Sequence, residues 1–117
     1  MWAAKDNGRY ANWPEAKSYC ESYRGGGHTD WRMPTQNELA GLYHSSKPRP
    51  ARCSTNGRVH LTTELIDLSC WYVWGAETRS AFLIGPTGAV FNFNNGILEW
   101  APQRGGTYQA LPVRSGK

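Results

Sequence analysis

Two segments in the first half of the chain carry apolar residues at helical spacing. The first, residues 12–24, opens with Asn12, and Glu15 follows three positions later, as in the reciprocal capping box of a helix N-terminus. Pro14 fits the first turn, and the glycine run 25–27 ends the helix. The predicted buried stripe consists of Trp13, Ala16, Cys20 and Tyr23.

The second predicted helix begins at Thr35, where Glu38 completes another capping box, and runs to about Ser45. Pro34 keeps Met33 extended before the helix. We expect Asp30 and Arg32 to fix this turn through backbone hydrogen bonds and an ion pair rather than to transfer protons. The apolar face of the helix is expected to consist of Leu39, Leu42 and Tyr43.

Residues 47–69 show no regular period, and one short helix is predicted around their only apolar cluster. That cluster contains Leu61, Leu65, Ile66 and Leu68.

The last third of the chain has the alternation of β-strands. Residues 71–78 predict one strand, and residues 81–100 predict a three-stranded meander with turns at Thr87-Gly88 and Asn95-Gly96. These turns pair Phe93 with Leu98 and Phe91 with Trp100. The predicted buried face contains Phe82, Ile84, Phe91, Phe93, Leu98 and Trp100, and the opposite face contains Asn92, Asn94, Ile97 and Glu99.

The length of the chain allows one domain, which covers residues 1–117. Its composition is polar and rich in Trp and Gly, with 6 Trp and 13 Gly residues. Residues 108–115 are expected to pair with residues 1–6 and bring the termini together. No apolar run is long enough for a membrane span, and the N-terminus lacks a signal peptide, so we expect no direct membrane insertion. The chain is expected to be part of a longer surface protein.

The formal net charge of +4 suits an acidic partner, but no helix carries a basic stripe, so nucleic-acid binding is not expected. Four basic residues cluster in the irregular segment and form either a solvated loop or an anion-binding patch: Lys47, Arg49, Arg52 and Arg58.

Three cysteines leave two interpretations open. The first is one disulfide with one buried thiol, which fits an oxidising compartment. Cys53 with Cys70 is then the favoured pair, although Cys20 could replace either. The second interpretation is three reduced cysteines in the core. The cysteines and histidines match no zinc spacing, so no metal or cofactor is expected.

Four motifs in their order along the chain carry a resemblance to a known family: MWAAKDNG, NWPEAKSYC, GGGHTDWRMPTQNEL and ALPVRSG. The chain resembles the C-terminal domain of the Legionella collagen-like adhesin and its bacterial relatives. That group is related to the formylglycine-generating enzyme branch of the C-type lectin fold. The resemblance implies an α+β, C-type lectin-like fold with two helices packed on a small twisted antiparallel sheet.

The chain departs from these patterns in three places. Relatives often carry a cysteine in the final strand, where this chain has Leu111-Pro112-Val113. The reactive cysteine pair of the formylglycine-generating enzymes has no counterpart, and the calcium-binding triplets of C-type lectins are absent. Neither that activity nor a calcium–sugar site is therefore expected.

Residues 71–117 are also similar to the variable region of proteins diversified by retroelements, which place binding residues on C-terminal strands and loops. Together these features predict a non-enzymatic, extracellular or cell-surface recognition domain. Its partner is expected to be a cell-surface glycan, anionic or sulfated, or a protein receptor, and the collagen-like relatives imply a trimer. The candidate ligand-binding residues are Tyr72, Trp74, Asn92, Asn94, Asn95, Ile97, Glu99, Gln103, Arg104 and Tyr108, where Tyr72 and Trp74 could equally be core residues.

Two functions other than recognition fit the sequence less well. A structural or oligomerising head of a surface filament is the alternative, and an enzyme is least favoured because no nucleophile–base spacing unites the candidate groups His28, His60, Glu77 and Asp30. Glu77 and Arg79 are interpreted as an ion pair between strands.

Overall fold

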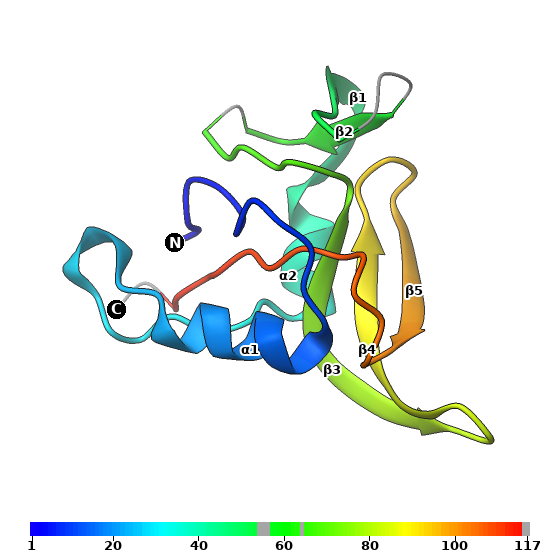
Figure 1. Ribbon diagram of the computed structural model, residues 1–117. Helices are drawn as coiled ribbons and strands as arrows, with labels where there is room; N and C mark the ends of the chain where they lie inside the picture. The colour runs from blue at the N-terminus through cyan, green and yellow to red at the C-terminus, as the bar shows by residue number, and fades with distance from the viewer. Residues whose placement is uncertain (54–56, 64, 116–117) are drawn as a thin grey trace.

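The computed structural model describes residues 1–53, 57–63 and 65–115 (Figure 1). It is an α+β arrangement in which two helices and a 3-10 turn precede two antiparallel sheets. The elements are α1 (Trp13–Ser22), η1 (Gly25–Gly27), α2 (Gln36–Leu42), β1 (Tyr43–Pro50), β2 (Arg58–Leu61), β3 (Tyr72–Ala81), β4 (Gly85–Asn92) and β5 (Ile97–Pro102).

Both predicted capping boxes are present. In α1 the Asn12 side chain accepts from the Glu15 backbone N–H at 2.9 Å, and the Glu15 carboxylate accepts from the Asn12 N–H at 2.9 Å. Thr35 and Glu38 make the same reciprocal pair at the start of α2. The second helix is shorter than predicted, because residue 43 already has extended backbone angles and pairs with Leu61 of β2.

The Glu38 carboxylate also forms a bidentate ion pair with the Arg32 guanidinium, in which both N–O distances are 2.8 Å. This pair, with a hydrogen bond from the Thr35 backbone, lowers the pKa of Glu38 from 4.5 to about 2. Asp30 pairs separately with Arg114 at 2.7 Å. Asp30 and Arg32 therefore both form ion pairs, but each with its own partner rather than in the one pair that was predicted.

Replacing Glu38 with glutamine is expected to cost about 1 kcal/mol near neutral pH. The pair is partly solvated, with side-chain exposed fractions of 37% and 33%, so screening limits its contribution. Glutamine still accepts from the Thr35 N–H, so the substitution isolates the ion pair. Because the folded-state pKa is lowered, the stabilisation is present above pH 4.5 and is lost as the pH falls toward 2. Urea unfolding of both proteins across this pH range should show the difference shrinking, and a constant difference would contradict this assignment.

The segment expected to hold a short helix forms a hairpin instead, since β1 pairs with β2 and the described part of residues 47–69 contains no helix. Of the predicted apolar cluster, Leu61, Ile66 and Leu68 are buried, whereas Leu65 has an exposed fraction of 84%. The favoured disulfide between Cys53 and Cys70 is present. Cys20 is a free, buried thiol whose pKa is raised to about 12 by burial.

The second sheet has the order β3-β4-β5, with β4 in the centre. The predicted turn at Thr87-Gly88 is wrong: both residues lie inside β4, where a side chain on Gly88 would overlap the Trp13 ring. The glycine therefore permits close packing rather than a turn. The chain reverses at residues 82–84, so Phe82 and Ile84, expected in the core, are exposed.

The register between β4 and β5 differs from the predicted one by two residues. Phe91 pairs with Leu98, and Ala89 pairs with Trp100, because residues 93–96 form a longer loop. In this loop the Asn92 carbonyl accepts from the Gly96 N–H at 2.7 Å, and Gly96 has φ +77°. A shift of two residues preserves the alternation of faces, so Phe91, Leu98 and Trp100 still share one face. Of the three, only Phe91 is buried as predicted: Leu98 has an exposed fraction of 37%, and Trp100 is half-buried.

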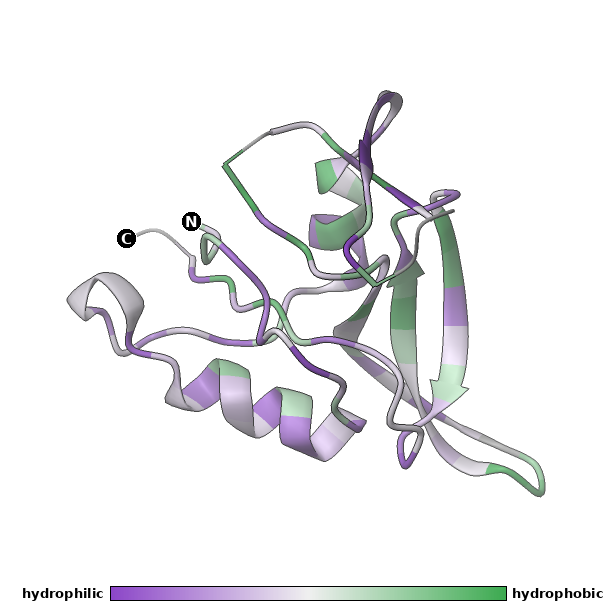
Figure 2. Ribbon diagram, turned by 45° about the horizontal axis from the view of Figure 1, so that its top comes forward, coloured by the Kyte–Doolittle hydropathy of each residue, from purple (hydrophilic) through white to green (hydrophobic). Residues whose placement is uncertain are grey.

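The sheet divides the core into two layers. One layer joins Phe91 and Phe93 to Leu39 and Leu42 of α2, and the other joins Trp74 and Val90 to α1. The central strand is thus covered on both sides, and Figure 2 shows hydrophobic residues along it. The predicted single buried face is wrong for β4, in which residues 87–92 are all buried.

The first and last parts of the described chain lie side by side, as predicted. The Met1 ammonium donates to the Arg114 carbonyl at 2.9 Å, and the Arg114 N–H donates back to the Met1 carbonyl at 2.8 Å. Ala3 and Pro112 add a third backbone hydrogen bond. Residues 111–114 therefore lie along residues 1–3 through isolated bridges rather than a long strand.

Candidate ligand-recognition site

Four predicted ligand-binding residues meet at one end of the β3-β4-β5 sheet, and we call them the Glu99 cluster: Tyr72, Asn92, Glu99 and Tyr108. The Tyr72 hydroxyl lies 3.3 Å from each carboxylate oxygen of Glu99, and the Asn92 amide nitrogen lies 3.5 Å from one of them. The rings of Tyr72 and Tyr108 meet edge-on with centroids 5.0 Å apart. The cluster therefore joins two phenols, one amide and one carboxylate.

Strand register places the cluster on one face. Tyr72 lies opposite Asn92, and Glu99 lies opposite Val90, so alternate positions of three adjacent strands meet on that face. Tyr108 arrives from the segment that follows β5. Backbone hydrogen bonds between Gln109 and β3, each 3.0 Å long, hold this segment beside Tyr72.

Within the described residues, the Glu99 carboxylate accepts hydrogen bonds from the uncharged donors Tyr72 and Asn92 and forms no ion pair. Burial raises the pKa of Tyr72, and the negative charge of Glu99 raises it further, so the phenol stays protonated and can donate. The site therefore offers acceptors on a carboxylate and donors on phenols. Such a site suits a hydroxyl, amide or ammonium group of a ligand.

Trp74 is a core residue, which was one of the two predictions for it. Its side chain is fully buried, and its indole N–H donates to the Ala11 carbonyl at 2.8 Å. It lies on the same face as Tyr72, two residues away, but α1 and the segment before it cover that part of the sheet. Asn92 is also buried, at 5% exposure, rather than exposed as predicted.

The amides of the β4–β5 loop shape the loop itself. The Asn92 side chain accepts from the Asn94 N–H, and the Asn95 side chain accepts from the Ile97 N–H. Asn94 is exposed and also accepts a long hydrogen bond from the Arg58 N–H at 3.4 Å. Ile97 is exposed beside the Glu99 cluster, with an exposed fraction of 54%.

Two other predicted ligand-binding residues lie at the opposite end of the sheet. The Gln103 amide donates to the Thr87 carbonyl at 3.2 Å, and the Arg104 guanidinium donates to the Ile84 carbonyl at 3.4 Å. They flank the β3–β4 turn and do not join the Glu99 cluster.

The four predicted anion-binding residues have separate surroundings. Lys47 and Arg49 line one open groove of about 670 Å³ beside β1. Arg52 forms an exposed ion pair with Asp67 at 2.8 Å, and the Arg58 side chain donates to the Gly57 carbonyl. Lys47 and Arg49 therefore share a groove, whereas Arg52 and Arg58 each contact a different partner.

The candidate catalytic groups do not share a site either. Asp30 binds Arg114, and the ring of His60 lies 3.0 Å from the Phe93 carbonyl. The predicted ion pair between Glu77 and Arg79 is wrong: Glu77 accepts from the Gln36 N–H at the start of α2. Arg79 instead lies over the Trp100 ring, 4.2 Å from its centroid.

The described residues contain no group of three or more His, Cys, Asp or Glu side chains that could hold a metal ion. Within the same ranges, no helix has the length and apolar character that crossing a membrane requires.

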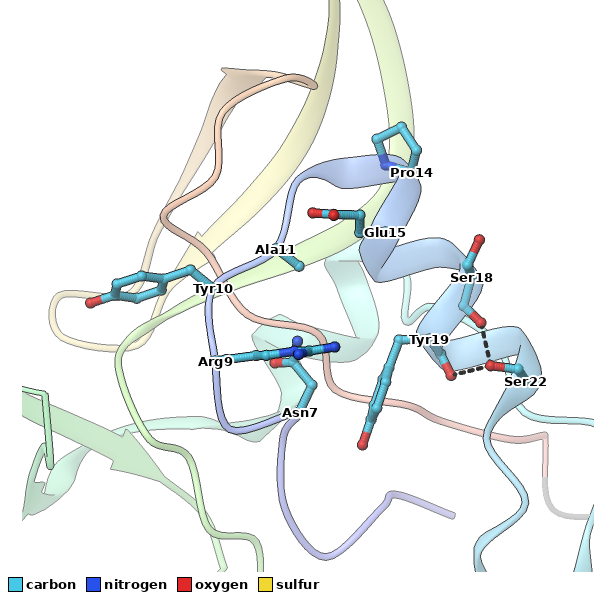
Figure 3. A pocket seen from close by; sticks show the side chains of 9 residues that line it. All are labelled: Asn7, Arg9, Tyr10, Ala11, Pro14, Glu15, Ser18, Tyr19 and Ser22. Atoms are coloured by element: carbon cyan, nitrogen blue, oxygen red, sulfur yellow. Dashed lines mark hydrogen bonds between the residues drawn. The ribbon is translucent and has the colours of Figure 1, made fainter.

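One groove was not predicted from the sequence. It has a volume of about 610 Å³ and lies between α1 and the loop that precedes it. Figure 3 shows Arg9 reaching from the loop toward Tyr19 of α1, while Tyr10 points away from the helix. The groove exists because the Ala11 N–H donates to the Tyr108 carbonyl and fixes the loop, a long-range contact with no local sequence signal.

Comparison with known proteins gives one match. The family model described as the Lcl C-terminal domain matches residues 1–114, nearly the whole chain. Neither the comparison with curated proteins nor that with solved structures found a match.

Proposed function

This chain belongs to the Lcl C-terminal domain family, and we propose that it is a non-enzymatic recognition or adhesion domain for a cell-surface glycan or a protein receptor. The observation that carries the proposal is the Glu99 cluster, where a half-buried carboxylate lacks a cationic partner in the described residues. A ligand donor would complete the hydrogen bonding of this carboxylate.

The composition of the cluster supports recognition of a polar ligand. The Tyr72 and Tyr108 rings offer broad contact area with little loss of side-chain entropy. The carboxylate and amide hold donors and acceptors at fixed positions, which suits sugar hydroxyls or the backbone of a protein receptor. Exposed Ile97 and Asn94 extend the surface around the cluster.

An anionic or sulfated glycan would need a second contact away from Glu99, since like charges repel. The groove lined by Lys47 and Arg49 supplies positive charge for that contact. Replacing both residues should then weaken binding of sulfated glycans more than binding of neutral ones.

The proposal extends to the setting of the domain. Adjacent termini and two helices against an antiparallel sheet support a C-type lectin-like fold. The Cys53–Cys70 disulfide and the family are consistent with an extracellular or cell-surface location. A recognition face on C-terminal strands also fits a variable protein diversified by retroelements. Such a domain could act as a trimer, which sedimentation equilibrium would reveal.

Replacing Glu99 with glutamine is expected to weaken ligand binding about tenfold or more, because a charged acceptor is lost. The substitution keeps the shape of the side chain and leaves an amide that Tyr72 and Asn92 can still contact. Binding is measured on an array of neutral and sulfated glycans, with ligands that bind the unaltered chain followed by titration.

The matched control is Glu21→Gln, which removes a carboxylate from the exposed face of α1, where it pairs with Lys17. This variant should bind as the unaltered chain does, and both variants should melt at the same temperature. If Glu99→Gln binds every ligand as tightly as Glu21→Gln does, the Glu99 cluster is not the recognition site.

A further inference from the structure

The β3–β4 hairpin ends in three consecutive exposed apolar residues, which we call the hairpin tip: Phe82, Leu83 and Ile84. Phe82 and Leu83 each have an exposed fraction of 90%, and Ile84 has 46%. Figures 1 and 2 show the hairpin projecting beyond the rest of the molecule, with its hydrophobic residues at the far end. Single exposed apolar residues are common, but three together at the end of a projection mark an interaction site.

The backbone of the tip adds a second observation. Leu83 has φ +69°, and it is the only residue other than glycine with positive φ in the described part of the chain. This conformation is unfavourable for leucine and costs nothing for glycine. Leu83 therefore occupies a position whose backbone conformation favours glycine, and its side chain does not pack in the core. This combination points to a role for the leucine outside the domain.

Positive charge surrounds the base of the tip. Arg79 is exposed and lies over the Trp100 ring, and Arg104 is exposed and donates to the Ile84 carbonyl. Residues 78–88 and 100–108 contain no Asp or Glu. The carboxylates just outside these ranges are engaged elsewhere, Glu77 at the start of α2 and Glu99 in the Glu99 cluster.

From this arrangement we propose that the hairpin tip docks on an anionic lipid membrane. Phe82, Leu83 and Ile84 enter the interface between headgroups and acyl chains, while Arg79 and Arg104 contact anionic headgroups. The half-buried ring of Trp100 lies beneath Arg79 at the base of the hairpin. The sequence pattern predicts that Phe82 and Ile84 lie in the core and that the domain does not insert into a membrane. Because both side chains are exposed, the structure changes both expectations.

The test is cosedimentation of the full chain with vesicles of phosphatidylcholine, with and without phosphatidylserine. We expect binding to the vesicles that contain phosphatidylserine, and we expect added salt to weaken it. The double variant Phe82→Ser and Leu83→Gly should bind these vesicles about tenfold or more weakly, because it removes two apolar side chains from the interface.

Two controls separate membrane docking from unfolding and from general stickiness. Leu83→Gly alone should weaken binding without lowering the melting temperature, because glycine accepts the positive φ. Leu65→Ser changes an exposed leucine far from the hairpin in sequence, with an exposed fraction of 84%, and should bind vesicles as the unaltered chain does.

Three outcomes would overturn the proposal. The first is absence of binding to vesicles of either composition. The second is equal binding by the tip variant and the unaltered chain. The third is concentration-dependent self-association that the tip variant abolishes while vesicle binding is absent, which would assign the tip to contact with a second copy of the chain.

Discussion

Replacing Trp74 with alanine is expected to lower the free energy of unfolding by about 3–5 kcal/mol. The side chain is fully buried, and its ring meets the Tyr108 ring edge-on with centroids 5.0 Å apart. Its indole N–H also satisfies the carbonyl of Ala11 at 2.8 Å. Alanine would therefore leave both a cavity and an unpaired buried acceptor. Denaturant unfolding followed by far-ultraviolet circular dichroism measures the loss.

Trp100→Ala is the matched control for this prediction. Trp100 is only half-buried and lies beneath the exposed side chain of Arg79, so part of its surface already faces water. Its removal should cost clearly less than removal of Trp74. Equal losses for the two variants would mean that Trp74 does not anchor the layer between the sheet and α1.

Removing the disulfide is expected to cost about 3 kcal/mol, because Cys53 and Cys70 close a loop across a sequence separation of 17 residues. The cross-link restricts the unfolded chain in a segment whose described residues contain one short strand, β2, and one isolated bridge at Asp67. The double variant Cys53→Ser and Cys70→Ser should therefore melt at a lower temperature than the unaltered chain. Thermal unfolding with and without dithiothreitol provides the measurement.

The reductant supplies an internal control. It should lower the melting temperature of the unaltered chain and leave that of the double variant unchanged. Cys20 does not complicate the comparison, because it is buried and its pKa is raised to about 12, which suppresses the reactive thiolate. A drop in the melting temperature of the double variant on reduction would contradict the assigned pairing.

The helices could be predicted from the sequence because their signals are local. Asn12 with Glu15 and Thr35 with Glu38 each satisfy backbone donors within one turn, so no distant contact is needed to start the helix. The C-terminal end of α2 has no such local signal. Tyr43 leaves the helix to pair with Leu61, a residue whose position depends on the whole irregular segment.

The faces of the meander could be predicted more reliably than its turns. Alternation fixes which residues share a face, and a register error of two residues preserves it. The turn predicted at Thr87-Gly88 is wrong, because the glycine there makes room for the ring of Trp13, a residue 75 positions earlier in the chain. The apolar residues that follow Ala81 resemble a core strand for the same reason: nothing local indicates that they lie beyond the cover of the helices.

The residue types of the candidate site could be predicted from the sequence, but the boundary between the site and the core could not. Tyr72 and Trp74 occupy equivalent positions on one face of β3, and the sequence treats them alike. They differ because α1 and the segment before it cover Trp74 and leave Tyr72 half-exposed. Where a helix layer ends over a sheet is decided by long-range packing, so the boundary between core and recognition surface emerges only in three dimensions.

The backbone hydrogen bonds between Met1 and Arg114 have a consequence for engineering. Since the first and last described residues leave the molecule at one place, the domain can be inserted into a surface loop of a carrier protein without stretching that loop. A circular permutant could join these ends through a short linker and open the chain at an exposed loop such as Gly106. Insertion would present the Glu99 cluster and the hairpin tip without a free end beside them, whereas a permutant opened at Gly106 has its new ends two residues from Arg104 and Tyr108.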